Sequence, residues 1–308
     1  MPPLYIRHPS SLEHDTGAHP ERPARIEAIE ARLSRADWLG LEVVEAPAAD
    51  RAQLERVHPP EHVDSIAGLS HRGGGMIDAD TVMSAGSYAA ALHATGGAVH
   101  AVDRLVGGGD GFAFCGLRPP GHHAERARAM GFCLFNNVAV AAAHALAEHG
   151  LERVLVVDWD VHHGNGTEEV FYESDSVLYA SLHQSPLYPG TGAESDTGRG
   201  QGEGFTVNVP LPPGSGEAEF AGGLEDRVLA RAGEWHPQLV CVSAGYDGHR
   251  DDPLADCELD EGAYARMSRM VREAAEGWDA PVLVCLEGGY ELGALAGSVE
   301  ATIDAFTA

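Results

Sequence analysis

The chain is poor in the features that mark several large classes of protein. Only 5 of its 308 residues are cysteine, and none form a Cys-x-x-Cys pair, which argues against both a disulfide framework and a cysteine zinc site. No run approaches the ~18 apolar residues that a membrane span requires. Residues 1–15 show no cationic end followed by an apolar run, so they do not predict a secretory signal. We therefore expect a cytoplasmic protein without a membrane partner.

Basic residues are also scarce. The chain has 20 lysines and arginines against 47 aspartates and glutamates, a formal net charge of −27. Nucleic-acid phosphates and anionic lipids bind basic surfaces, so we expect no nucleic-acid partner. Two interpretations of the acidity stay open. It is either a solvated surface, as in salt-tolerant organisms, or an acidic pocket entrance that attracts cationic substrates.

Apolar runs alternate with amphipathic, alanine-rich segments along the chain. We expect strands at 112–116, 154–160, 176–183, 204–209, 239–246 and 281–286, and helices near 21–36, 50–70, 86–106, 136–149, 216–235 and 261–277. Unbroken apolar strands are typical of strands covered on both faces. The pattern predicts an α/β fold of three layers, with helices on both faces of a mostly parallel central sheet. No repeat or linker divides the chain, so we expect a single domain over 1–308.

Ligands of open α/β sheets bind beyond the carboxyl ends of the strands. Directly after the apolar run 154–157 come Asp158, Asp160 and His162. Alternate side chains of an extended chain share a face, so we expect these three to point together. Carboxylates and an imidazole crowded at a buried strand end are costly without a cation. Aspartate oxygen together with histidine nitrogen suits zinc.

Three further clusters follow expected strands or turns. Asp247 lies in a glycine-rich loop and could supply a third metal ligand, leaving a fourth position for water as in catalytic zinc sites. His122 and His123 follow a Pro-Pro-Gly turn, a pair that could provide a general base and an electrostatic partner. Tyr290 follows two glycines at a strand end, where its hydroxyl can donate to an oxyanion.

These residues, in this order, resemble the histone deacetylase superfamily of zinc-dependent deacetylases, which share the arginase-like fold. The resemblance covers nearly the whole chain and rests on the motifs at 19–25, 118–124, 131–137, 158–166, 181–183, 189–192, 244–253 and 287–290. Asn137 and Asn165 are more similar to the class II and bacterial amidohydrolase branch than to class I, which tends to carry aspartate at both places.

The resemblance implies roles for individual residues. Asp160, His162 and Asp247 become the zinc ligands, His122 and His123 the tandem histidines, and Tyr290 the oxyanion donor. Asp158 is similar to the acid that orients His122 and holds a structural potassium ion. That ion is completed by Ser181 and by the carbonyls of Asp160, His162 and Leu182. A second monovalent site is implied near Phe171, Ser174, Val177 and Phe205. Phe132 and Tyr188 resemble the walls of an acyl-lysine channel, and Gly131 offers a carbonyl to the substrate amide.

Three positions bear on chemistry and substrate. Asn165 replaces the acid that orients His123 in class I, so we expect His123 to lose its proton more easily and to act as the base. Tyr188 stands where phenylalanine is common and places a hydroxyl in the channel. Leu254 stands where polyamine-preferring relatives carry an acidic gatekeeper, which favours acetyl-lysine or neutral acyl substrates. A neighbouring subunit or another loop, with Asp78 or Asp80, could still supply that acid.

The expected activity is zinc-dependent hydrolysis of an N-acyl amide, with acetyl the expected acyl group, on acetyl-lysine or a related small acylated amine. Alternatives are an acetylpolyamine amidohydrolase, a two-manganese ureohydrolase of the same fold, or a non-catalytic acyl-lysine-binding protein. The predicted metal cluster has too few carboxylates for two manganese ions, which disfavours the ureohydrolase. The presence of Tyr290 and both histidines disfavours the non-catalytic binding protein. The natural substrate, the acyl length and the oligomeric state, a homo-oligomer included, stay open.

Overall fold

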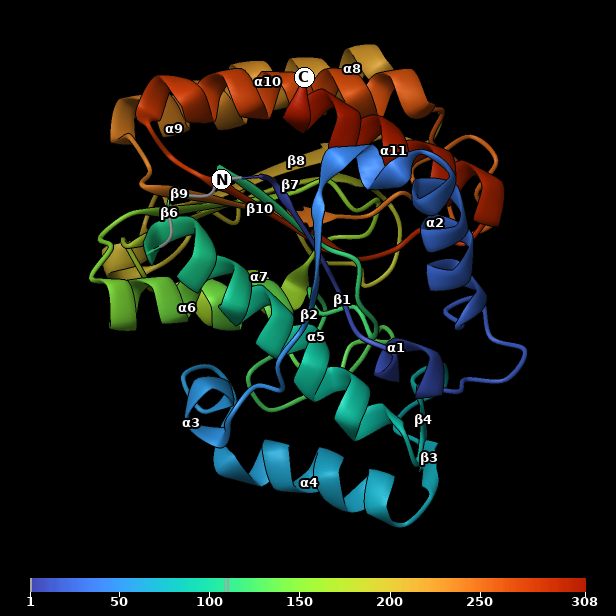
Figure 1. Cartoon of the computed structure of the whole chain (residues 1–308). Coiled ribbons are helices and arrows are strands. Elements are labelled where there is room, and N and C mark those ends of the chain that lie inside the picture. Colours follow the sequence, from blue (N-terminus) through green and yellow to red (C-terminus); the bar gives the residue numbers. More distant parts are fainter. Residues whose placement is uncertain (1, 108, 110) are drawn as a thin grey trace.

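A parallel sheet runs through the middle of the computed structural model, which describes residues 2–107, 109 and 111–308 (Figure 1). Its eight strands lie in the order β2-β1-β5-β10-β9-β6-β7-β8, and all neighbours pair in parallel. They are β1 (Leu4–Arg7), β2 (Glu42–Glu45), β5 (Phe112–Cys115), β6 (Val154–Asp158), β7 (Val177–Gln184), β8 (Thr206–Leu211), β9 (Leu239–Ala244) and β10 (Val282–Leu286). A separate antiparallel hairpin joins β3 (Gly74–Met76) to β4 (Val82–Ser84).

Helices cover both faces of the sheet, which confirms the predicted three-layer α/β fold (Figure 1). One face carries α2 (Ala24–Arg35), α8 (Glu217–Gly223), α9 (Ala230–Trp235), α10 (Glu261–Trp278) and α11 (Leu292–Thr307). The other carries α5 (Ser87–Val102), α6 (Asn137–His149) and α7 (Asn165–Phe171). The short α1 (Ser10–Glu13) packs on α5. Beyond that layer, α4 (Pro60–His71) lies beside the hairpin and α3 (Arg51–Leu54) contacts α6.

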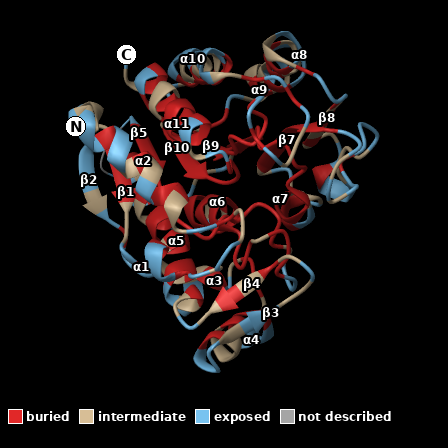
Figure 2. Cartoon of the chain, turned by 90° about the vertical axis from the view of Figure 1, so that its right-hand side faces the viewer, coloured by how far each residue is buried: buried red, intermediate tan, exposed pale blue. Residues whose placement is uncertain are grey.

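Burial explains why the central strands are apolar throughout. Every residue of β6, β7, β9 and β10 is buried, because helices lie on both sides of them (Figure 2). The edge strand β2 has mostly exposed residues. Two apolar clusters lie on opposite faces, one around Trp159 and one around the alanine-rich side of α6. The core therefore holds the carboxyl ends of the central strands in fixed positions.

Several predicted boundaries were wrong, for identifiable reasons. The segment 50–70 forms two helices, because Pro59 and Pro60 interrupt the pattern and Pro60 starts the second one. The helix expected at 86–106 becomes a π-helical turn after Val102. The strand expected at 154–160 ends at Asp158. Among the strands and α-helices of the described residues, the pattern also missed seven, namely β1, β2, β3, β4, α1, α7 and α11.

The missed elements lack the usual signals. Strand β1 has only four residues, and β2 carries glutamate at both ends. Helix α11 lies against both α2 and α10 and buries residues around most of its circumference, so it shows no strong polar face. The predicted helix α6, in contrast, carries a cap at each end: Asn136 accepts from the Ala139 N–H at its start, and Gly150 ends it with φ +64°.

Candidate active site

Four loops with polar residues leave the sheet side by side. They follow β5, β10, β9 and β6, which are consecutive neighbours in the strand order. Because these strands are parallel, their carboxyl ends meet at one edge of the sheet. The loops carry the residues that the sequence analysis singled out, and the structure brings them to one place.

The first group at this edge is the sheet-end cluster, which consists of Asp160, His162 and Asp247. His162 Nδ1 lies 3.1 Å from Asp160 Oδ1 and 3.0 Å from Asp247 Oδ2. The carboxylates are fully buried and the imidazole nearly so. Asp247 Oδ1 also accepts from the Val161 N–H, and Asp160 Oδ2 accepts from the Gly288 N–H. These backbone contacts hold the carboxylates toward the shared imidazole.

The donor set of the sheet-end cluster fits a zinc ion. Burial lowers the pKa of His162, but Asp160 and Asp247 outweigh it and raise that pKa to about 10. In the protein alone a proton on the imidazole therefore supplies positive charge between the carboxylates, and a divalent cation meets the same demand. Tetrahedral zinc at about 2.0–2.1 Å from its ligands holds them about 3.3 Å apart, close to the spacing found.

Two glycines allow the carboxylates to approach so closely. A Cβ on Gly245 would lie 2.1 Å from Asp160 Oδ2, and one on Gly288 would lie 2.1 Å from Asp247 Oδ2. No real Cβ makes such a contact, so any larger residue at either position would displace a carboxylate. The motifs Ala-Gly-Tyr-Asp and Glu-Gly-Gly-Tyr thus have a steric reason.

Asp158 does not point with the sheet-end cluster as an extended strand would require. The chain leaves the sheet after Asp158, and its carboxylate lies 3.0 Å from His122 Nδ1. Asp158 Oδ2 also accepts from the Tyr179 hydroxyl at 3.2 Å. The strand-alternation argument therefore placed Asp158 wrongly, while the family resemblance had paired it with His122.

The tandem histidines have opposite partners. His122 Nδ1 faces the Asp158 carboxylate, whereas His123 Nδ1 faces Asn165 Oδ1 at 2.9 Å. Burial lowers the pKa of His122, but Asp158 and Asp160 outweigh burial and hold it well above its usual value. Burial and the neighbouring His122 and His162 hold the pKa of His123 well below its usual value. Such a divergence is typical of an acid and a base sharing a site.

Tyr290 reaches the same place from the loop after β10. Burial and the Asp247 charge hold its pKa well above the usual value, so its hydroxyl keeps its proton. The ring lies 5.9 Å from Phe132, edge to face, and 5.1 Å from the Arg25 guanidinium. Arg25 also donates to the Gly289 carbonyl at 2.6 Å. Arg25 thereby fixes the loop that presents Tyr290.

Sequence reasoning gave no role to the buried acids that support these loops. Glu287 Oε2 accepts from the Gly121 N–H at 2.7 Å and the His122 N–H at 3.1 Å, so it sets the position of the tandem histidines. Glu21 is buried, and Arg118 pairs with both of its oxygens. A glutamate directly after an apolar run was the available signal for Glu287. Nothing in the sequence pattern indicated the pairing of Glu21 with Arg118.

A pocket of about 220 Å³ opens above the sheet-end cluster. Its lining includes all four predicted substrate residues, Gly131, Phe132, Tyr188 and Leu254, together with His122, His123, His162, Tyr290, Asp80, Pro120, Leu187 and Gly288. Phe132 has φ +69°, an unusual conformation for a residue with a side chain, and packs against His19. The Tyr188 ring lies edge to face with His123, 5.2 Å between centroids.

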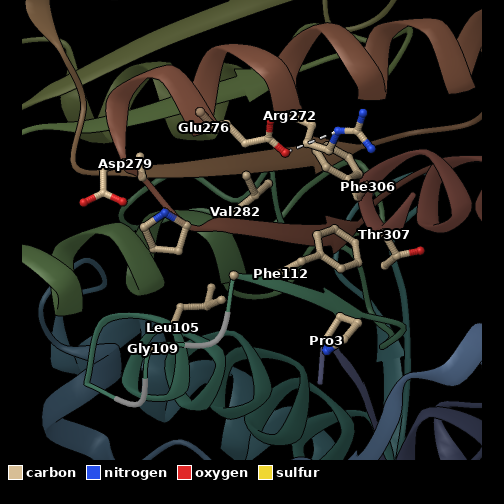
Figure 3. A pocket seen from close by; sticks show the side chains of 14 residues that line it. Pro3, Leu105, Gly109, Phe112, Arg272, Glu276, Asp279, Val282, Phe306 and Thr307 are labelled. Carbon is tan, nitrogen blue, oxygen red and sulfur yellow. Dashed lines mark ion pairs between the residues drawn. The ribbon is translucent and has the colours of Figure 1, made fainter. Parts of the chain in front are cut away.

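A larger cavity, of about 600 Å³, lies at the opposite end of the sheet, where β5 and β10 begin (Figure 3). Phe112, Val282 and Phe306 form an apolar part of its wall, with the Phe112 and Phe306 rings stacked at 4.9 Å. Among the described residues of its lining, the charged ones are Arg272, Glu276 and Asp279, and none is histidine. This described lining offers no nucleophile–base pair, so we place the chemistry in the smaller pocket.

The residues predicted to bind monovalent ions lie along β7 and its neighbours. Ser181 pairs with Asp158 in the register of β6 and β7, and its hydroxyl lies 2.9 Å from His183 Nδ1. At the second predicted site, the Phe171 carbonyl accepts from the Ser174 N–H and the Phe205 carbonyl from the Tyr179 N–H. These contacts do not test ion binding, so both sites stay predictions.

A second group of possible metal ligands lies away from the pocket. This helix cluster consists of Asp103, His144 and His149, and Asp103 Oδ1 lies 2.8 Å from Nε2 of each histidine. Arg56 donates to His144 Nδ1 at 3.2 Å, so the His144 proton must sit on Nε2 and point at Asp103. A nitrogen that carries a proton is no metal ligand, and the contacts describe a hydrogen-bonded clasp between α5 and α6.

In the part of the chain that the structure describes, no helix combines the length and the hydropathy needed to cross a bilayer.

The histone deacetylase domain matches the chain over residues 19–306. A probable deacetylase of Archaeoglobus fulgidus is 39% identical over 292 residues, 93% of this chain and 81% of that protein. A histone deacetylase-like amidohydrolase of Pseudomonas aeruginosa is 42% identical over 252 residues, 81% of this chain and 66% of that protein. The crystal structure of the HDA15 HD domain superposes with a TM-score of 0.94 at 38% identity, covering 100% of this chain and 90% of that one. The chain belongs to the histone deacetylase family.

Proposed function

We propose that this enzyme hydrolyses the N-acetyl amide of acetyl-lysine or of a similar small acylated amine, with one zinc ion held by Asp160, His162 and Asp247. One observation carries the proposal: His162 of the sheet-end cluster, two histidines with opposite partners and Tyr290 all line a single small pocket. When bound, zinc supplies a Lewis acid that polarises the acyl carbonyl and lowers the pKa of a water to about 7.

The two histidines divide the proton transfers. His123 is neutral, and its Nδ1 is engaged by Asn165, so Nε2 is available to accept the proton of the attacking water. His122 is held in its charged form by Asp158 and can donate a proton to the leaving amine. The contrast between a carboxylate partner and an amide partner thus assigns acid and base.

Tyr290 stabilises the charge that develops on the carbonyl oxygen. Its hydroxyl keeps its proton at neutral pH, the residue lines the pocket, and Phe132 and Arg25 hold the ring. A preorganised donor of this kind contributes a factor of about 10²–10³ to turnover, or about 3–4 kcal/mol.

The pocket walls favour a narrow, mostly apolar substrate arm. Phe132 and Tyr188 supply aromatic faces, and Leu254 adds an apolar surface. An acetyl group on a four-carbon lysine chain suits a pocket of about 220 Å³. We further propose that a potassium ion at Asp158, Ser181 and Leu182 stiffens the loop that carries the zinc ligands.

A second candidate activity, on acetylated polyamines, has one observation in its favour. Asp80 lines the pocket, and burial together with its neighbour Asp78 raises the pKa of Asp80. A carboxylate at the pocket wall attracts a cationic chain. Leu254 remains the argument for acetyl-lysine, because the acid of polyamine-preferring relatives is absent there.

The test is turnover by zinc-loaded protein on three substrates: an acetyl-lysine peptide, N8-acetylspermidine and a long-chain acyl-lysine peptide. We expect the acetyl-lysine peptide to give the highest kcat/KM. A higher value for acetylspermidine, lost in Asp80→Asn, would establish the polyamine alternative. If none of the three substrates is hydrolysed, the proposed function is wrong.

A further inference from the structure

His123 begins a hydrogen-bonded chain that leads away from the pocket. Its Nδ1 lies 2.9 Å from Asn165 Oδ1, and Asn165 Nδ2 donates to Glu125 Oε1 at 2.8 Å. His123 and Asn165 are buried, whereas Glu125 is half-buried. Glu125 and Asn165 also line a cleft of about 620 Å³ that does not include the histidine. These hydrogen bonds therefore connect the reaction pocket to the cleft that Glu125 and Asn165 line.

The direction of these hydrogen bonds is fixed at the Glu125 end. A carboxylate only accepts, so it must be met by the NH₂ group of Asn165. The amide oxygen of Asn165 then faces His123, and because that oxygen only accepts, His123 Nδ1 must carry the proton. A neutral imidazole has one proton, which leaves Nε2 bare on the pocket side.

The loop that carries Glu125 is held on several sides. The Glu125 N–H donates to the Arg128 carbonyl at 2.9 Å, and the Arg126 N–H donates to Glu169 Oε2 at 2.8 Å. The Ala124 carbonyl accepts from the Asn136 side chain at 3.2 Å. The backbone at Glu125 is thus held by contacts that do not involve Asn165.

We propose that Glu125 is a positioning residue that sets the tautomer of His123 by orienting the Asn165 amide. A carboxylate facing a histidine directly, as Asp158 faces His122, requires a proton on the nearest ring nitrogen by itself. An amide has both a donor and an acceptor end, so Asn165 alone leaves the tautomer undetermined. Glu125 removes that ambiguity as the strong acceptor of the Asn165 NH₂ group, and the weak acceptor Met130 Sδ, at 3.4 Å, favours the same orientation. The effect on turnover rests on the proposed function, but the tautomer itself does not.

The test compares three residues of similar length at position 125. Lysine only donates, so Glu125→Lys should turn the Asn165 amide, present its NH₂ to His123 and move the proton to Nε2. Methionine cannot donate and accepts only weakly through its sulfur, so Glu125→Met should give a mixture. Glutamine can accept through its oxygen, so Glu125→Gln should keep most of the wild-type tautomer.

The readout is nitrogen-15 NMR of histidine-labelled protein, with the His123 signals assigned by their loss in His123→Gln. We expect a proton on Nδ1 in wild type and on Nε2 in Glu125→Lys. In the zinc-loaded enzyme, kcat should fall about 10²-fold in Glu125→Lys, the scale of a general base, and less in Glu125→Met.

Glu173→Lys is the matched control. Glu173 lines the same cleft and pairs with Arg199, so the variant repeats the charge change without a contact to Asn165. It should leave the His123 signals unchanged. If the proton stays on Nδ1 in both Glu125→Lys and Glu125→Met, the proposal is wrong, because packing alone would then hold the amide. This result stands even if no acyl amine is hydrolysed.

Discussion

Two clusters of the same residue types lie in different surroundings in this molecule. Each brings three aspartate or histidine ligand atoms within 4.8 Å of one another. The sheet-end cluster has two buried carboxylates around one imidazole, whereas the helix cluster has one half-exposed carboxylate between two imidazoles. The first has an excess of buried negative charge and needs a cation. The second is satisfied by its own hydrogen bonds and by Arg56.

The comparison shows that residue type and spacing do not identify a metal site. What separates the clusters is where the protons can sit. In the helix cluster Arg56 directs the His144 proton toward Asp103. In the sheet-end cluster the buried Asp pair leaves a demand for positive charge that one imidazole proton meets only in part.

The largest effect should come from removing one carboxylate of the sheet-end cluster. Asp247→Asn keeps the shape but lowers the negative charge, so we expect loss of bound zinc and a fall in turnover of about 10³-fold or more. Metal analysis and initial rates measure both. Asp103→Asn, the same change in the helix cluster, should alter neither. Equal losses of zinc and turnover in Asp247→Asn and Asp103→Asn would show that the two clusters do not differ as metal sites.

A smaller loss is expected from the hydroxyl above the sheet-end cluster. Tyr290→Phe removes the oxyanion donor but keeps the ring between Phe132 and Arg25. We expect kcat to fall about 10²–10³-fold, with bound zinc unchanged. The control is Tyr88→Phe, which removes the hydroxyl of a half-buried tyrosine outside the pocket. A rate within twofold of wild type would remove Tyr290 from the mechanism.

His58 is a buried imidazole without a carboxylate partner, so its pKa should shift in the opposite direction to that of His162. The His58 Nδ1–H donates to the Arg126 carbonyl, and Nε2 accepts from the Asn136 N–H. Burial and the neighbouring His62 lower the pKa of His58 to about 4. His58 therefore stays neutral in the folded protein while the unfolded chain takes up a proton near pH 6.5.

The stability from neutral His58 is thus present above pH 6.5 and is lost as the pH falls toward 4. At pH 4.5 the loss is about 2.5 kcal/mol. His58→Gln keeps a donor and an acceptor but no titration, so its unfolding free energy in urea should fall less between pH 7 and 4.5. The exposed His71→Gln is the control. If the unfolding free energies of wild type and His58→Gln fall equally between pH 7 and 4.5, this account of His58 is wrong.

The smallest effect belongs to the helix cluster itself. Asp103 is about half exposed, and its histidine partners lower its pKa. Exposed ion pairs contribute about 0–1 kcal/mol, so Asp103→Asn should lower the unfolding free energy by less than about 1 kcal/mol in urea. A loss of several kcal/mol would show that the clasp between α5 and α6 is a main support of the fold.

The sequence predicted the parallel sheet and the meeting of its strand ends, because unbroken apolar strands followed by polar loops are a local signal. It could not place Asp158, since the chain after β6 is held by other segments: the Trp159 N–H donates to the Ser243 carbonyl, and the Val161 N–H donates to Asp247 Oδ1. The helix cluster was also missed. His144 and its partner Asp103 lie 41 residues apart in sequence, so no local pattern joins them.

Supporting residues were the least predictable part of the site. Glu125 acts through Asn165, and Glu287 acts through backbone N–H groups near His122. Neither role has a spacing signature, because each depends on how two loops meet in space. The family resemblance gave roles to Asp158 and Asn165 behind the tandem histidines, but none to Glu125 or Glu287.

The most direct test of the account is anomalous diffraction at the zinc edge from crystals of protein loaded with excess zinc. We predict one strong peak per chain among the side chains of Asp160, His162 and Asp247, and none at Asp103, His144 and His149. A peak at the helix cluster with none at the sheet end would contradict the central claim.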